Sequence, residues 1–250
     1  MKNTEFKGVG FVLLENEKFD FEKLRKDLKE DFSIAIPPED FDTTSKNLVS
    51  NIGDNMLVVS FMPAPVPNGE AAINAQNNYT WKEAVKIAEE HKAHLIVSVL
   101  GKSNAVEKAK LFVNICASCL KQKTATGLFS SGTVWNPEYY RKLAQYYYEE
   151  ENFPTMNLIY FGFYHGSGEN RISAYTFGLR DFEKSELEII DSQEEYEDIY
   201  NMLSSISEYI LTANVELQDG ETIGLSAEQK LLITKSKGIA LEEETLKIKY

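Results

Sequence analysis

Two cysteines are spaced so that they could carry out redox chemistry. Cys116 and Cys119 form a CASC motif, the spacing of thiol–disulfide sites. Such a site needs its first cysteine at a helix N-terminus, where the helix dipole lowers the thiol pKa. Here both cysteines come late in a predicted helix, on the face of Ala105, Ala109 and Phe112. We therefore expect both thiols to pack in the core as small apolar groups.

Two histidines complete a Cys₂His₂ count, which is a set of zinc ligands. His91 is expected to end a helix and His94 to begin a strand, so their side chains should diverge. Charge at a helix C-terminus explains His91, and a hydrogen bond at a strand start explains His94. We predict no metal and no cofactor.

The third histidine, His165, lies in the sequence HGSGEN close to Ser167, Glu169 and Arg171. A nucleophilic serine needs a base and an orienting acid that converge on it, and neighbours in a hairpin rarely do so. The loop also lacks the strand-to-helix context of a dinucleotide site. We expect a solvated hairpin turn whose glycines adopt positive φ. The segment 219–224 lacks a calcium ligand series and is expected to be a turn. No catalytic residue is assigned, and the sequence favours a protein that is not an enzyme.

Charge is distributed unevenly along a chain whose net charge is −13. Residues 1–125 carry a net charge of −1 and residues 126–250 a net charge of −12. A surface of this kind either keeps a protein soluble or attracts a basic partner. The same charge disfavours binding to DNA or RNA. The candidate docking residues are the acidic groups Glu149, Glu150, Glu151, Glu194, Glu195, Glu197 and Asp198.

Tyrosines are concentrated on one predicted helix, residues 136–150. Tyr139, Leu143 and Tyr146 follow one stripe, which leaves Tyr140 or Tyr148 nearer the surface. Exposed tyrosines beside acidic residues suit a protein–protein interface, so Tyr140 and Tyr148 join the candidate site. Crowding on one helix is the alternative explanation.

The elements that position these residues follow from apolar periodicity and capping signals. In the first half we predict strands at residues 8–14, 33–36, 56–62 and 94–100. Helices are predicted at residues 20–31, capped by Asp20, and at 80–91, with a capping box of Thr80 and Glu83. The order is β-α-β-β-α-β.

A similar order recurs after a predicted helix at residues 105–122. Further helices are predicted at 136–150, with Pro137 in its first turn, and at 192–212, with a capping box of Ser192 and Glu195. Strands are predicted at residues 126–131, 156–164, 171–179, 231–234 and 245–249. The expected fold is α+β, with two tandem ferredoxin-like halves joined by a helix. The boundaries are an N-terminal half at 1–103, a linking helix at 104–124 and an acidic C-terminal half at 125–250.

The composition, 43% hydrophobic and 26% charged, is that of a folded globular protein. The longest uncharged stretches are too short and too rich in Pro and Gly to span a membrane. The apolar stretch 9–14 is followed by Glu15 and Glu17, so we expect a strand and no signal peptide. We expect a cytoplasmic protein with no disulfide framework.

Four stretches together resemble a bacterial family of unknown function, domain-of-unknown-function family 4261. They are MPAPVP at residues 62–67, HKAHLIVSVLG at 91–101, DGETIGLSAEQK at 219–230 and GIALEEETLKI at 238–248. The resemblance extends over nearly the whole chain, with its most specific part in the last forty or so residues. It implies an intracellular bacterial protein and brings no catalytic residues.

We therefore expect a binding protein with no catalysis of its own. Two alternatives stay open. One is an antitoxin-like or immunity-like protein whose acidic half neutralises a basic toxin. The other is an enzyme that acts on a small molecule in a cleft between the halves, which a buried carboxylate or histidine of perturbed pKa would favour.

Overall fold

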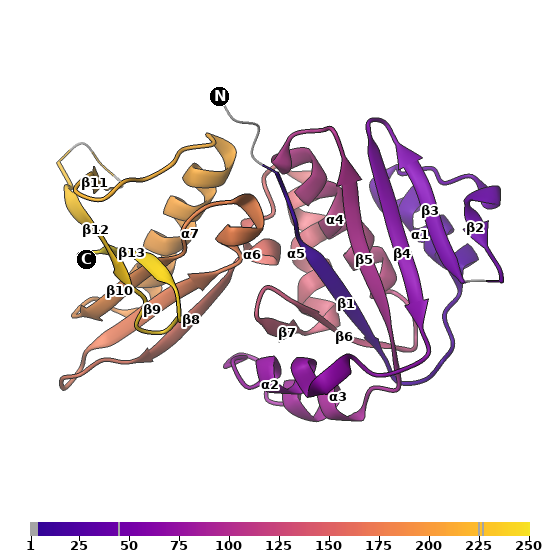
Figure 1. Ribbon diagram of the computed structural model, residues 1–250, viewed down its shortest axis with the longest axis horizontal. Coiled ribbons are helices and arrows are strands. Elements are labelled where there is room, and N and C mark those ends of the chain that lie inside the picture. The colour runs from indigo at the N-terminus through magenta and orange to yellow at the C-terminus, as the bar shows by residue number, and fades with distance from the viewer. Residues whose placement is uncertain (1–4, 45, 225, 227) are drawn as a thin grey trace. The chain divides into compact units, whose positions relative to one another are not determined.

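The computed structural model describes residues 5–44, 46–224, 226 and 228–250. The chain divides into two compact units, Met1–Leu158 and Ile159–Tyr250 (Figure 1). Each unit contains one β-sheet together with its own helices.

The first unit is built on a seven-stranded sheet of order β2-β3-β4-β5-β1-β6-β7, in which every pairing is antiparallel. Its strands are β1 (Val9–Leu14), β2 (Phe41–Asp42), β3 (Asn47–Ile52), β4 (Asn55–Met62), β5 (Ala93–Gly101), β6 (Ala125–Ser130) and β7 (Thr133–Trp135). Strand β1 lies between β5 and β6, so the N-terminal strand is central and both of its edges are paired.

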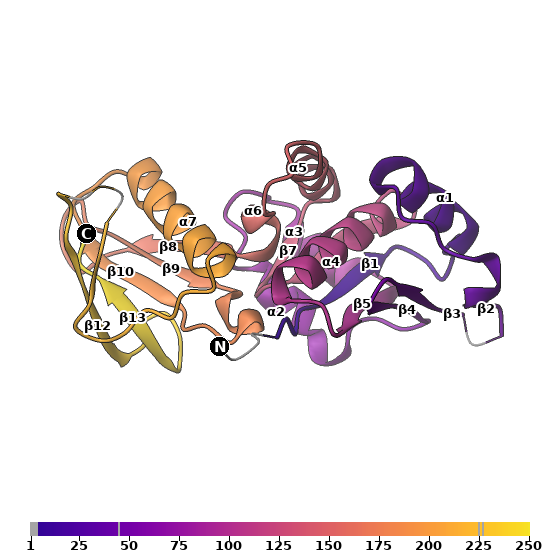
Figure 2. The ribbon, with the colours of Figure 1, turned by 90° about the horizontal axis from the view of Figure 1, so that it is seen from above.

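Helices cover both faces of this sheet. Figure 2 shows α1 (Phe21–Phe32), α4 (Ala105–Cys119) and α5 (Pro137–Glu149) together on one face. The short helices α2 (Glu70–Ala75) and α3 (Ala84–Glu90) pack near β6 and β7 on the other face. The remaining helical segments of the unit are α6 (Thr155–Leu158) and two 3₁₀ turns, η1 (Pro38–Asp40) and η2 (Pro67–Gly69).

Side chains of β1 alternate between two cores. Leu13 packs with Ala71, Ala84 and Phe129 in the core under α2 and α3. Gly10 faces α4, where a Cβ would lie 3.1 Å from the ring of Phe112. The absence of a side chain at Gly10 is therefore what lets α4 approach the middle of the sheet.

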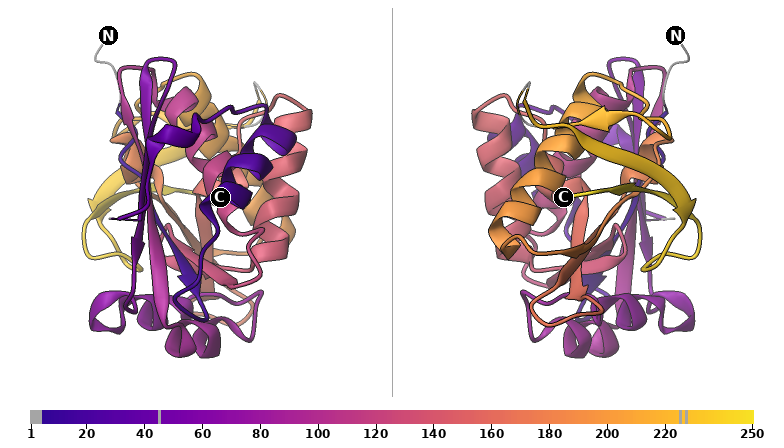
Figure 3. Two further views of the ribbon diagram at one scale, coloured as in Figure 1. Left: turned by 90° about the vertical axis from the view of Figure 1, so that its right-hand side faces the viewer. Right: turned by 90° about the vertical axis from the view of Figure 1, so that its left-hand side faces the viewer.

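The second unit has a six-stranded sheet of order β11-β12-β13-β10-β9-β8, seen from its own side in the right-hand view of Figure 3. Its elements are β8 (Tyr160–His165), β9 (Ile172–Phe177), η3 (Leu179–Phe182), β10 (Leu187–Ser192), α7 (Tyr196–Thr212), β11 (Thr222–Ile223), β12 (Leu231–Lys237) and β13 (Glu244–Ile248). Strands β10 and β13 are parallel, whereas the other pairs are antiparallel. Helix α7 packs on β8 and β9.

A mixed α+β protein is confirmed, but the tandem ferredoxin-like halves are not. Strands β6 and β7, predicted to open the second half, pair with β1 in the first sheet. Helix α4, predicted to link two halves, packs on β5 and β1 as a layer of the first unit. The chain divides at residues 158 and 159 rather than around residues 104–124. The reason is that β1 needs a partner on each edge, and only β6 supplies the second one.

The two predicted single-residue helix caps, Asp20 and Asn136, are confirmed, and the two predicted capping boxes are wrong. Asp20 accepts a hydrogen bond from Lys23 N, and Asn136 accepts one from Tyr139 N. Helix α3 begins at Ala84 rather than Thr80, because Asn78 Oδ1 binds Thr80 N and Trp81 N and holds that segment in a turn. Helix α7 begins at Tyr196, with no side chain from Ser192 or Glu195 capping it.

The strand predicted at residues 33–36 is also wrong. Ser33 adopts a left-handed conformation, with φ 56°, and ends α1. Ile34 N then binds Leu28 O, so the backbone closes the helix instead of joining the sheet. Ile34 and Ile36 are buried without strand pairing, which explains the apolar pattern.

Among the described residues, no helix has the length and apolar character needed to cross a membrane.

Candidate functional site

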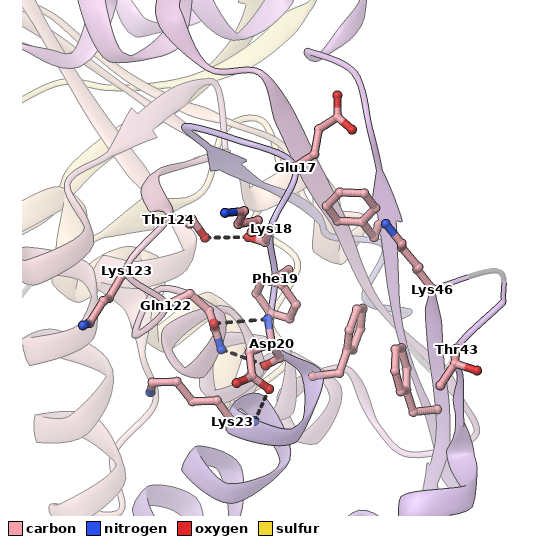
Figure 4. A pocket seen from close by; sticks show the side chains of 13 residues that line it. Glu17, Lys18, Phe19, Asp20, Lys23, Thr43, Lys46, Gln122, Lys123 and Thr124 are labelled. Atoms are coloured by element: carbon pink, nitrogen blue, oxygen red, sulfur yellow. Dashed lines mark hydrogen bonds between the residues drawn. The ribbon is translucent and has the colours of Figure 1, made fainter.

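The most distinctive hollow on the first unit is an open pocket of about 590 Å³ between the segment that follows β1 and the strands β2 to β4. Figure 4 shows Phe19 and Asp20 on one wall, with Thr43 and Lys46 on the opposite wall. We call it the phenylalanine–lysine pocket. It is lined by Glu17, Lys18, Phe19, Asp20, Phe21, Lys23, Phe41, Thr43, Lys46, Phe61, Gln122, Lys123 and Thr124.

Four phenylalanines form its apolar surface. The rings of Phe21 and Phe61 are buried, whereas Phe19 and Phe41 are half-buried. Phe21 stacks on Phe41 with centroids 4.1 Å apart and meets Phe19 edge-on at 4.9 Å. The three rings support one another, so the apolar wall is held in place by aromatic packing.

Lysines supply the charge of the pocket. Lys46 holds its ammonium 4.7 Å from the centroid of Phe61, within the range of a cation–π contact. Lys23 is paired with Asp27 at the start of α1. Lys18 and Lys123 are exposed, and neither they nor Lys46 form an ion pair with another described residue. The lining therefore holds more positive than negative charge in a protein whose net charge is −13.

The wall that carries Phe19 is fixed by the turn between α4 and β6. Gln122 donates from Nε2 to Asp20 O at 2.9 Å, and its Oε1 accepts from Asp20 N at 3.3 Å. Thr124 donates from Oγ1 to Lys18 O at 2.8 Å. Because these bonds join positions about one hundred residues apart, the pocket forms only when the first unit is folded.

Two other hollows lack this combination of rings and unpaired lysines. In one, beside α5, Lys121 is paired with Asp31 and Lys142 with Glu138. The other lies beside α7 in the second unit, where the charged lining groups are Glu216 and Glu221.

The structure places the CASC and histidine pairs on opposite faces of the first sheet. Cys116 lies under Gly10 on the face of α4. His94 contacts Phe11, whose side chain belongs to the core under α2 and α3. The four groups cannot converge on one zinc ion. Within the part of the chain that the structure describes, no group of three or more His, Cys, Asp or Glu side chains is arranged to hold a metal.

Both cysteines are helical and buried, as predicted. Burial raises the pKa of the Cys119 thiol, and the neighbouring Asp27 raises it further. Burial likewise raises the pKa of Cys116 well above its usual value. Neither thiol is activated for nucleophilic or redox chemistry, because the thiolate is strongly disfavoured.

The two histidines have structural hydrogen bonds. His91 Nδ1 faces Ala88 O at 2.5 Å, and its Nε2 accepts from Val66 N at 2.8 Å. This pair of bonds requires a neutral ring with its proton on Nδ1. His94 Nδ1 faces Ala64 O at 2.7 Å. Burial is the main cause that lowers the pKa of both rings.

The candidate acidic residues are all exposed, but they belong to different units. Glu149, Glu150 and Glu151 lie at the C-terminal end of α5 in the first unit. Glu194, Glu195, Glu197 and Asp198 lie at the N-terminal end of α7 in the second unit. The helix dipole favours carboxylates at an N-terminus and disfavours them at a C-terminus. The helix dipole therefore accounts for the carboxylates at the start of α7, but it does not account for the carboxylates at the end of α5.

The predicted tyrosine stripe on α5 is wrong. Tyr140 is fully buried and packs against Trp135, while Asn157 Nδ2 binds its carbonyl oxygen. Tyr139 and Tyr146, assigned to the packed stripe, are 45% and 55% exposed. The buried face follows Tyr140 and Ala144, because α5 turns that stripe toward α4. Tyr140 is therefore excluded from any surface contact.

Tyr148 remains available on that helix. It is 38% exposed, and its ring meets Phe32 edge-on.

The HGSGEN segment forms the predicted hairpin between β8 and β9. Ser167 is bound to Asp191 and not to His165 or Glu169 of the same loop. Ser167 donates its hydroxyl to Asp191 Oδ2 at 2.5 Å and its N–H to Asp191 Oδ1 at 2.7 Å.

The expected positive φ is wrong for both glycines of this loop, Gly166 and Gly168; the residue of the loop with positive φ is Asn170, at 57°. A Cβ at Gly166 would lie 2.3 Å from Asp191 Oδ1, so a side chain there would displace this carboxylate.

Two buried glutamates that sequence analysis did not single out organise the second unit. Glu188 accepts hydrogen bonds from Ala240 N at 2.8 Å and Thr245 Oγ1 at 2.8 Å, and Lys247 lies 3.2 Å away. Glu186 accepts from Thr176 Oγ1 at 2.6 Å. Their position in the sequence ELEII gave no signal, because the hydrogen-bond donors come from other segments: residues 176–180 for Glu186 and residues 239–245 for Glu188.

Both glutamates lie in the part of the chain that matches a known family model. Residues 175–249 match the family model described as Domain of unknown function (DUF4261). The resemblance noted from residues 219–230 and 238–248 is confirmed, and both glutamates lie in the DUF4261 segment. Residues 62–67 and 91–101 lie outside the match, as does the phenylalanine–lysine pocket. No curated protein and no solved structure matches the chain.

We predict that Cys116 and Cys119 react slowly with a thiol reagent such as dithionitrobenzoate in the native protein. Both thiols are buried and protonated, so labelling requires the helix region to open. The control is the same protein in denaturant, where two thiols should react at once. Labelling of the native protein at the denatured rate would contradict the buried environment.

We predict that acid destabilises the first unit through His91. The pKa of His91 is lowered on folding, so its stabilising effect is complete above about pH 6.5 and is lost as pH falls through the lowered value. Trp81 and Trp135 both lie in this unit, so urea unfolding followed by tryptophan fluorescence reports on it. Between pH 7.5 and pH 5.5, wild type should lose more free energy of unfolding than His91→Gln. Equal losses would show that His91 does not titrate on folding.

Proposed function

We propose that this protein works by binding, with no catalysis of its own, and that the phenylalanine–lysine pocket holds a small anionic ligand. The observation that carries this proposal is the presence of three lysines outside ion pairs around an apolar aromatic surface. A volume of about 590 Å³ is in the range of small-molecule sites.

Charge supports an anionic ligand. Lys18, Lys46 and Lys123 form no ion pair with a described carboxylate, whereas Lys121 and Lys142 beside the hollow at α5 do. The pocket lining carries four lysines and two carboxylates, Glu17 and Asp20. A cluster of like charges is unfavourable in the empty protein, and an anion relieves that repulsion. Phosphate groups are natural partners for lysine ammonium groups.

The binding reading also fits the residues that could do chemistry. The histidines of the first unit are occupied in backbone hydrogen bonds, and the cysteines are buried. None of them lines the phenylalanine–lysine pocket. The pocket therefore offers charge and apolar contact, with no histidine or cysteine in its lining.

We expect calorimetric titration with sodium tripolyphosphate, a compact polyanion, to show saturable binding that weakens as salt increases. The double variant Lys18→Gln/Lys46→Gln should weaken binding by about tenfold, since each charge contributes on the order of 0.5–1 kcal/mol at an exposed site. The matched control is Lys82→Gln/Lys86→Gln, which removes two exposed lysines at and before α3, outside the pocket. Equal weakening in both double variants would show that binding follows net charge, and the pocket would be excluded.

A second candidate is docking of a basic protein, as in an antitoxin-like or immunity-like protein. The three carboxylates at the C-terminal end of α5 favour it, because the helix dipole opposes them. Glu149 accepts a hydrogen bond from Gln145 Nε2 at 2.8 Å, and Glu150 and Glu151 form no ion pair with a described residue. Tyr148 lies in the same last turns and is partly exposed. The proposed contact is therefore Tyr148 with Glu149, Glu150 and Glu151.

We expect this surface, if it docks a basic partner, to lose that partner when Glu149, Glu150 and Glu151 are changed to Gln. The measurement is a pull-down from the native host at 50 and 500 mM salt. Glu89→Gln/Glu90→Gln, at the end of α3, is the control for general loss of charge. A partner kept equally by all three proteins at both salt concentrations would leave the acidic residues a solubilising role only.

One observation bears on the alternative that the protein is an enzyme: two carboxyl groups have a raised pKa. Burial raises the pKa of Asp181 to about 6, and burial also raises the pKa of Glu186, with a smaller contribution from the charge of Asp181. Glu186 is nevertheless bonded to Thr176 Oγ1, Gly178 N and Arg180 N, which hold the turn η3. Neither carboxylate lines any of the three hollows. We therefore assign the pair a structural role.

A further inference from the structure

The aromatic surface of the phenylalanine–lysine pocket has a flat part that is open to solvent. Phe41 is half-buried, and one face of its ring is stacked on Phe21 at 4.1 Å and 21°. Because Phe41 is half-buried and lines the pocket, part of its surface remains accessible there. Half-buried Phe19 adds a second ring beside the same Phe21. Such a platform favours a flat, apolar group, because stacking buries both faces without reorganising the protein.

A cation lies beside this platform. Lys46 comes from the segment between β2 and β3, while Phe41 belongs to β2 itself. The ammonium group of Lys46 lies over the ring of Phe61, 4.7 Å from the ring centroid. Lys18 and Lys123 line the pocket as well. A ligand that satisfies both features must carry a flat ring and an anionic group in one molecule.

Three polar side chains of the lining, those of Asp20, Gln122 and Thr124, already have hydrogen-bond partners. Both ends of the Gln122 amide bind the backbone of Asp20, and the Asp20 carboxylate accepts from Lys23 N. The Thr124 hydroxyl donates to Lys18 O. Thr43 is exposed. The lining thus offers stacking surface but no buried amide or carboxylate to read the edge of a ring.

We propose that the ligand of this pocket is a nucleotide; this inference rests on the proposed function of the pocket as an anion site. The base stacks on Phe41, and the phosphates contact Lys18, Lys46 and Lys123. Stacking tolerates any base because every base has an aromatic face. Recognition is therefore by ring and charge, with little selectivity between bases.

A free nucleotide fits better than a nucleic acid. The protein has a net charge of −13, and the three lysines form one local patch. A polymer adds phosphates that lie beyond the three lysines and gain no attraction from them, whereas a mononucleotide ends within the pocket.

The test compares ATP, GTP, CTP and tripolyphosphate by calorimetry with the full chain at one ionic strength. ATP should bind about tenfold more tightly than tripolyphosphate, which is the contribution of one stacked base. Phe41→Leu should remove that advantage and leave tripolyphosphate binding unchanged. Tyr146→Leu, which removes an exposed ring on α5, is the matched control. The three nucleotides should bind within about fivefold of one another.

Each outcome separates the two proposals. Equal affinity for ATP and tripolyphosphate, both lowered by Lys18→Gln/Lys46→Gln, would overturn the nucleotide and keep the anion pocket. No binding of either probe would overturn both. Tighter binding of a ten-residue oligo-U than of UTP would overturn the free nucleotide in favour of a nucleic acid. Phe19→Leu tests the same platform if Phe41→Leu fails to fold, as judged by circular dichroism.

Discussion

The first unit depends on one constraint, that β1 is buried on both faces and paired on both edges. Leu13 fills the core under α2 and α3, and Gly10 leaves room for α4 on the other side. Pairing with β5 and β6 then fixes where β1 ends. The segment that follows it must turn beside the connection from α4 to β6, where Gln122 and Thr124 bind it. One wall of the phenylalanine–lysine pocket is thus a consequence of how the central strand is enclosed.

The second unit depends instead on buried carboxylates. Glu188, fully buried in β10, accepts hydrogen bonds from the loop between β12 and β13 and from Thr245. A buried carboxylate is strongly unfavourable unless its oxygens are satisfied in this way. The loop is fixed because the charge demands those donors. Glu186 and Glu188 must therefore be removed from any count of acidic surface, and the net charge of the C-terminal half overstates the field that a partner would meet.

The sequence predicted correctly those features that depend on neighbouring residues, such as helix caps and apolar strands. Asp20 and Asn136 cap α1 and α5 because a short acceptor side chain satisfies the first free N–H groups, wherever the helix packs. Apolar runs located β1, β4 and β5. Such signals do not predict which strands pair with each other. The sequence of residues 125–135 does not indicate that β6 pairs with β1 rather than belonging to a second half. Strand β3 was missed because its sequence NLVSNI is half polar, which suits a strand with one exposed face.

The pocket escaped prediction for the same reason, since its residues span positions 17 to 124 and meet only in the folded unit. Phe21 is buried at the start of α1, and its ring also stacks on Phe41 of β2 in the pocket. A near-neutral total over residues 1–125 also conceals a local excess of lysine. That locality has a physical consequence. Screening limits the reach of exposed charges to about 8 Å at physiological salt, so a small anion inside the pocket is governed by Lys18, Lys46 and Lys123. A longer polyanion extends beyond that distance, and its outer charges gain no attraction from these lysines. The arrangement of charge therefore selects ligands by size as well as by sign.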